Sequence, residues 1–161
     1  MPRSTDPLPN FRFMLELGSI QVAGFQECTG LQIEAKTLEY PEGGRNSTPL
    51  KFPDRGAISN VTLKRGFARG ASSDVLFKWS RDVVNGTFDA ADNPNRRPAD
   101  SDRDIDNRVG IVLLDDAGVE VKRWILFRPF PVKWAGPELK AEASGLAIET
   151  LELACEGLEM V

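Results

Sequence analysis

Residues 10–22, which read NFRFMLELGSIQV, decide the fold class of this chain. Aromatic or leucine side chains recur there at every second position, at Phe11, Phe13, Leu15 and Leu17. This two-residue period is typical of a half-buried β-strand. Gly18-Ser19 then supplies a turn, and Ile20 opens a second strand. The ordered part of the chain is therefore predicted to begin with an antiparallel strand pair.

Further strand patterns follow along the chain. The second strand is expected to run on through a break at Gly30 as far as Thr37, and another begins at Ile58, with Val61 and Leu63 inside. Later strands are expected over residues 109–114, over 119–134 as one bent strand, over 139–143, and over 146–158 as the closing strand.

One helix is predicted over about residues 73–85. An apolar stripe of Val75, Leu76, Trp79 and Val83 has helical spacing, and Gly86 can take the left-handed conformation that ends a helix. The whole pattern predicts a mainly β protein. It is an antiparallel β-barrel or sandwich of about seven or eight strands with one flanking helix.

The domain division follows from composition. Residues 1–9 hold three prolines without periodicity and are expected to form a flexible arm, and residues 10–161 form a single domain. Residues 41–56 hold three prolines and three glycines but keep Leu50 and Phe52, so we expect a binding loop between subunits. Residues 87–108 are expected to form a polar surface loop.

The charge is unevenly distributed over the 161 residues. The net charge is −4, but residues 51–81 carry +5 and residues 138–161 carry −5. Two such blocks could meet head to tail in copies of the chain, or they could be ordinary solvated faces. The net acidity argues against tight binding of nucleic acid.

The residue inventory excludes most catalytic chemistry. There is no histidine, so serine–histidine and cysteine–histidine nucleophile pairs and histidine-containing zinc sites are impossible. Phosphate-binding glycine loops are absent. Alternating aspartates at 100–106 fail as a calcium loop because Ile105 and Ile111 take the glycine and glutamate positions. We therefore expect no enzyme, no catalytic residue, no cofactor and no metal.

The two cysteines and the hydropathy pattern indicate where in the cell the protein is expected. Cys28 and Cys155 match no metal-binding spacing, and buried reduced thiols are favoured, although a disulfide between them stays open. No apolar run is long enough for a membrane helix, and residues 1–10 do not resemble a signal peptide. We expect assembly in the cytoplasm and no membrane anchor.

Five motifs occur in register with the predicted strands. They are residues 39–44 (EYPEGG), 62–66 (TLKRG), 113–115 (LLD), 131–137 (PVKWAGP) and 147–158 (AIETLELACEGL). Together they resemble the tail-tube proteins of contractile-tailed bacteriophages and the inner-tube proteins of extracellular contractile injection systems, a family related in fold to Hcp proteins of type VI secretion. Two positions depart from the family pattern, since it usually has Arg at Pro41 and His at Cys155.

The resemblance implies a structural subunit that forms hexameric rings stacked into a hollow tube. Its implied partners are copies of itself, a sheath protein, baseplate or hub proteins, terminator or cap proteins, and cargo or DNA in the lumen. The particle would be a phage tail or a contractile injection device. Two alternatives stay open: a tube initiator or cap of the same machine, and a monomeric β-sandwich whose loops bind a glycan or peptide.

By analogy with the family, two groups of residues are expected to make contacts between subunits. The first group, in and beside the 41–56 segment, is Glu39, Tyr40, Glu42, Gly43, Gly44, Leu50 and Phe52. The second is a set of charges in which Lys64 and Arg65 pair across a ring boundary with Glu149, Glu152 or Glu156.

Overall fold

A computed structural model describes residues 12–18, 20–41, 43–44, 49–67, 71–86, 108–140 and 145–161. The expected flexible arm at 1–9 and the polar loop, as far as residue 107, lie outside these residues. The described elements are β1 (Arg12–Leu17), β2 (Ile20–Thr29), β3 (Ile33–Tyr40), β4 (Leu50–Ile58), β5 (Val61–Gly66), α1 (Ala71–Val84), β6 (Arg108–Leu114), β7 (Glu120–Phe127), β8 (Phe130–Ala135), β9 (Ile148–Ala154) and β10 (Gly157–Met160).

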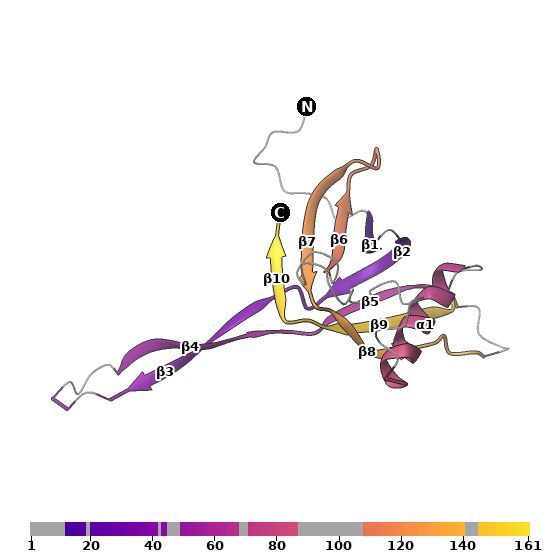
Figure 1. Cartoon of the computed structure of the whole chain (residues 1–161). Helices are drawn as coiled ribbons and strands as arrows, with labels where there is room; N and C mark the ends of the chain where they lie inside the picture. The colour runs from indigo at the N-terminus through magenta and orange to yellow at the C-terminus, as the bar shows by residue number, and fades with distance from the viewer. Residues whose placement is uncertain are drawn as a thin grey trace, which may run out of the picture.

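Eight of these strands form one sheet in the order β10-β7-β6-β1-β2-β5-β9-β8, and β3 and β4 form a separate hairpin. Every neighbouring pair is antiparallel. The sheet bends along β2, where Gly24 has a φ of +87° and the pairing with β5 shifts register between Phe25 and Glu27. The two halves of the sheet consequently cross, as in a sandwich (Figure 1).

The hydrophobic core fills the space between the two halves. Leu15, Leu17 and Ile111 come from one half, and Leu63 and Leu151 come from the other; all are at most 1% exposed. The leucines of β1, β5 and β9 alternate with more exposed residues along their strands, whereas Ile111 lies in β6, which is buried almost throughout. The inward positions of Val61 and Leu63 are confirmed.

The helix α1 lies against the end of the sheet that carries β8 (Figure 1). Leu76 and Trp79 are fully buried in the core, and Phe77 packs edge-on against Trp134 of β8 with ring centroids 5.0 Å apart. Gly86 has a φ of +69° after the last turn, as its place behind Asn85 predicts. The apolar stripe is core packing.

A buried ion pair joins the two central strands of one half. Arg65 of β5 lies directly opposite Glu149 of β9, its Nε donates to the Glu149 carboxylate, and both side chains are 1% exposed. The indole Nε1 of Trp134 donates to the second carboxylate oxygen of Glu149 at 3.2 Å. The Arg65 guanidinium also lies 5.5 Å from the ring centre of Phe25. Arg65 and Glu149 thus pair within one chain, where both are buried, and the contact expected of them across a ring boundary stays a prediction.

The structure corrects the sequence-based elements in several places. The mainly β class is confirmed, with one helix among the described residues, and the described strands of the large sheet do not close into a barrel. The strand expected over 119–134 breaks into β7 and β8 at Arg128, whose φ is +46°, because Pro129 has no N–H to continue the ladder. The strand expected over 146–158 turns between β9 and β10, where the Glu156 N–H donates to the Phe127 carbonyl at 3.0 Å. Leu139 and Lys140 are not in a strand.

Gly30 marks the point at which the chain leaves the sheet for the hairpin. Its φ is +88°, and a Cβ placed there would collide with the backbone carbonyl of Asn60. Only glycine fits this conformation and this close approach.

Breaking the buried pair should destabilise the fold. Glu149→Gln leaves the Arg65 guanidinium buried without its counter-charge, and we expect a loss of about 3–5 kcal/mol in the free energy of unfolding, measured by urea denaturation. The matched control is Glu27→Gln, which removes a half-exposed ion pair with Lys64 (3.0 Å) and should cost at most about 1 kcal/mol. Equal losses for the two variants would contradict a special role for the buried pair.

Candidate functional site

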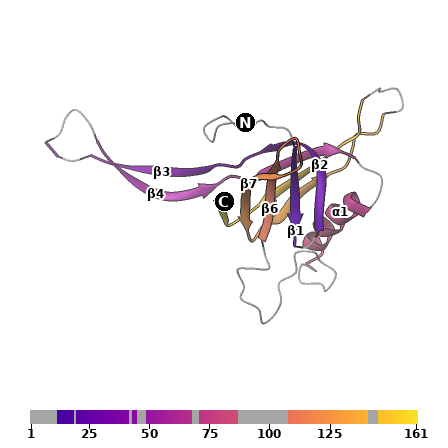
Figure 2. The same ribbon diagram turned by 90° about the horizontal axis from the view of Figure 1, so that it is seen from above.

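The β3–β4 hairpin, which we call the arm, is the most unusual feature of the structure. It extends away from the rest of the chain in both views (Figures 1 and 2). Its strands pair from Ile33 opposite Ile58 to Tyr40 opposite Leu50. Residues 50–56 are therefore strand, which corrects the prediction of a loop over the whole of 41–56. The region is a two-stranded projection with a short tip.

The outer part of the arm is amphipathic. Leu38 lies opposite Phe52, and Tyr40 lies opposite Leu50, so these four side chains share one face, which we call the apolar face. Leu38 is 57% exposed, Tyr40 59% and Phe52 49%. On the other face Glu39 lies opposite Lys51, and their side chains form an ion pair at 3.5 Å. The chain thus exposes a row of large apolar side chains that nothing in the described residues covers.

The tip of the arm contains the predicted glycine pair. Gly43 and Gly44 lie in an exposed turn, and Gly44 has a φ of +103°. Glu42 lies outside the described residues. The structure brings Glu39, Tyr40, Leu50 and Phe52 together at the end of the arm, as the shared motif predicts, but it does not test their contacts with another subunit.

The remaining predicted charges find partners within the chain. Lys64 pairs with Glu27, and the Asn60 amide donates to Glu152 at 2.8 Å. Arg128 donates to Glu156 at 3.0 Å. Lys64, Glu152 and Glu156 thus lie on the surface with partners of their own.

Both borders of the large sheet are open within the described part of the chain. No described strand pairs with the outer edge of β8 or of β10. Apolar side chains are exposed at both borders: Phe130, Val132 and Ile148 near β8, and Met160 and Val161 at β10. Unpaired borders of this kind favour pairing with another chain.

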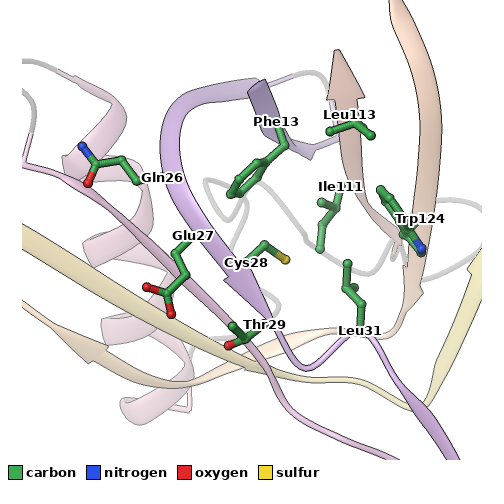
Figure 3. Close-up of a pocket in the computed structure, with 9 residues that line it drawn as sticks. All are labelled: Phe13, Gln26, Glu27, Cys28, Thr29, Leu31, Ile111, Leu113 and Trp124. Carbon is green, nitrogen blue, oxygen red and sulfur yellow. The ribbon is translucent and has the colours of Figure 1, made fainter. Parts of the chain in front are cut away.

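A cavity of about 360 Å³ opens beside the root of the arm (Figure 3). Its walls are mainly apolar and come from β1, β2, β6, β7 and the segment before β3: Phe13, Cys28, Leu31, Ile111, Leu113 and Trp124. Gln26, Glu27 and Thr29 complete the lining. Figure 3 shows the side chains of Gln26 and Glu27 extending away from the apolar group. The sequence did not predict this cavity.

The Cys28 thiol is one of the side chains that face the cavity. Both cysteines are free and half-buried, which confirms the reduced state expected and removes the alternative of a disulfide between them. Burial raises the pKa of Cys28 to about 11. Burial also raises the pKa of Cys155, although the Gly157 N–H opposes that shift. Neither thiol is an activated nucleophile.

The described residues hold neither a cluster of metal ligands nor a helix that could span a membrane. Nowhere in those ranges do three or more His, Cys, Asp or Glu side chains gather as metal ligands. None of the helices found there is long and apolar enough to cross a membrane.

The sequence of the chain matches the model of a known protein family. The sequence profile of the family described as "T4-like virus tail tube protein gp19" matches residues 9–159. The chain belongs to this family. Family membership confirms the resemblance seen in the five motifs and makes the chain a structural tail-tube protein and not an enzyme. No curated protein sequence matches it closely enough to count.

Several solved structures have a fold similar to that of this chain. A chain of the anti-feeding prophage cap (AFP tube terminating cap) has a TM-score of 0.71 and 23% identity, covering 100% of this chain and 95% of that one. A chain of the PVC sheath-tube complex, from an extracellular contractile injection system, has a TM-score of 0.72 and 24% identity, covering 98% and 93%. Hcp1 from Salmonella typhimurium has a TM-score of 0.51 and 10% identity, covering 92% and 91%.

The pH dependence of Cys28 alkylation should report its burial. In a Cys155→Ser background, the rate of reaction with iodoacetamide should rise with a midpoint near pH 11 in the folded protein and near about 8.5 in urea. Because folding raises the pKa of Cys28, protonation of this thiol contributes to the free energy of unfolding. The contribution is fully present below the pKa of the thiol in the unfolded chain and is lost as the pH rises toward its pKa in the folded chain. Identical midpoints in both states would contradict the burial of this thiol.

Proposed function

We propose that this chain is a subunit of the inner tube of a contractile tail or contractile injection device, forming hexameric rings that stack around a lumen for cargo or DNA. The observation that carries the proposal is the exposed apolar face of the arm in a member of the tail-tube family. Such a face has no function in a solitary chain and fits a surface of another copy.

The energetics of the arm favour docking. A two-stranded hairpin is at best marginally stable in water, and three strands or a packed surface are needed to stabilise it. Each Å² of apolar surface removed from water contributes about 25 cal/mol. Docking Leu38, Tyr40 and Phe52 on a second copy removes large apolar areas from water and gives the arm its missing layer.

The open sheet borders favour a ring. Since every step across the eight strands is antiparallel, β10 and β8 run in opposite directions. A second copy related by rotation about the ring axis can therefore add its β10 antiparallel to β8. A contact between two different borders is head to tail and closes into a ring when the rotation closes.

The proposed partners follow from the assemblies in which similar folds occur. Those assemblies include a sheath-tube complex, a tube-terminating cap and a baseplate. We infer a sheath, a baseplate or hub, and a terminator as partners of this chain, with subunits assembled in the cytoplasm before they join the particle.

The place of the chain along the tube is a second question. The structures from the cap and from the sheath-tube complex resemble this chain equally well. A trunk subunit repeats over many rings, whereas an initiator or cap forms one or two rings, so the copy number per purified particle distinguishes them. We propose the trunk role, because the arm and the open borders suit contacts that repeat from copy to copy.

Removing the apolar face should abolish assembly without unfolding the chain. We expect that Leu38→Ser combined with Phe52→Ser prevents rings and tubes in negative-stain images of the purified protein or of the particle. The free energy of unfolding of the monomer should change by less than about 0.5 kcal/mol, because both side chains are exposed.

The matched control is Lys51→Ser, on the opposite face of the same arm segment. This control should assemble as the unaltered chain does. Tubes of normal appearance from the Leu38 and Phe52 variant, or a chain that stays monomeric in the particle and at high concentration, would refute the proposed function.

A further inference from the structure

We infer that the cavity beside the root of the arm is the seat for the apolar face of a neighbouring copy's arm. This inference rests on the proposed function and adds to it the receiving surface. Nothing in the family match identifies that surface, and it is assembled from four separate stretches of the chain.

An arm that occupies this cavity must come from another molecule, because the chain's own arm cannot reach it. The cavity includes Thr29 and Leu31, which flank Gly30 at the arm's root. The apolar face lies at the opposite end of the arm, and eight residues of β3 span about 26 Å. Figure 1 shows the arm pointing away from the sheet that lines the cavity.

The chemistry of the two surfaces matches. The cavity walls present the aromatic rings of Phe13 and Trp124 with aliphatic side chains between them. The arm presents Phe52 beside Leu38. Aromatic rings gain about 0.5–1.5 kcal/mol beyond area burial when they meet in offset or edge-on geometry. A volume of about 360 Å³ lies at the lower end of the range of pockets that hold small molecules, so it suits a few side chains and not a whole strand.

The charges allow this docking. Glu39 and Lys51 lie on the opposite face of the arm and pair with one another, so seating the apolar face leaves this ion pair in solvent. The two charged or amide side chains of the lining, Glu27 and Gln26, extend away from the apolar walls, and Glu27 is paired with Lys64. No charge needs to be buried without its partner, which would be costly.

The arrangement also explains how the contact can propagate. Each copy has one arm and one cavity, so the contact is head to tail and every copy both gives and receives. Because the cavity lies at the arm's root, an arriving arm tip is held next to the point from which the receiving copy's own arm departs. A continuous series of arms follows from one repeated contact.

Because Cys28 lines the cavity, a disulfide cross-link to this native thiol can test whether a neighbouring arm occupies the cavity. In a Cys155→Ser background, Phe52→Cys places a second thiol on the apolar face, and mild oxidation at alkaline pH should link assembled copies into covalent oligomers on a non-reducing gel. Alkaline pH is needed because burial raises the pKa of Cys28. The matched control is Lys51→Cys, next in sequence but on the opposite face, which should give no oligomers. Adding Cys28→Ser to the Phe52→Cys variant should also remove them.

A second measurement avoids any change in the arm. In the Cys155→Ser chain, assembly should reduce the rate of Cys28 alkylation at least tenfold relative to dissociated subunits, because the arriving arm covers the thiol. If tubes form but Cys28 is neither cross-linked to the arm nor protected, the seat lies elsewhere and the inference is overturned while the proposed function stands. Protection by a co-purified apolar small molecule, detected by native mass spectrometry, would also overturn it. If no rings or tubes form in any preparation or particle, the proposed function falls and the inference with it.

Discussion

A sheet of two strands has two faces and no interior, and the exposure of the arm follows from that constraint. In the arm, each face of the β3–β4 pair is exposed to solvent unless another surface covers it. The two faces differ in the outer half of the arm. The Glu39–Lys51 ion pair lies on one face, and Leu38, Tyr40 and Phe52 lie on the other. The arm therefore has a defined side for docking before any partner arrives.

The sheet of eight strands, unlike the arm, has a buried interior. Its two halves cover one another, α1 covers one end, and the Arg65–Glu149 pair is sealed inside with Trp134 and Phe25. This body has a core of its own, so it can fold before assembly. The buried core thus lies in the sheet of eight strands, and the proposed assembly contact lies in the arm.

Much of this fold could be predicted from the sequence because half-buried strands leave a period of two. Phe13, Leu15 and Leu17 follow it, and Leu76 and Trp79 follow the helical period. The first part of β3 was predicted, as far as Thr37, but its end and the whole of β4 were missed. These arm strands bury neither face, and a bulge between Ala35 and Thr37 interrupts the alternation. The Arg65–Glu149 pair was read as surface charge, since only the β5–β9 register brings together residues 84 positions apart. The cavity could not be predicted because its walls come from distant segments that meet through the bend in β2.

Gly30 gives the arm its direction. The residue takes a left-handed conformation against the Asn60 carbonyl, where a single methyl group would not fit. A projection about 26 Å long turns a small rotation at its base into a displacement of several ångströms at its end. The backbone conformation at Gly30 therefore controls where the apolar face lies relative to the large sheet.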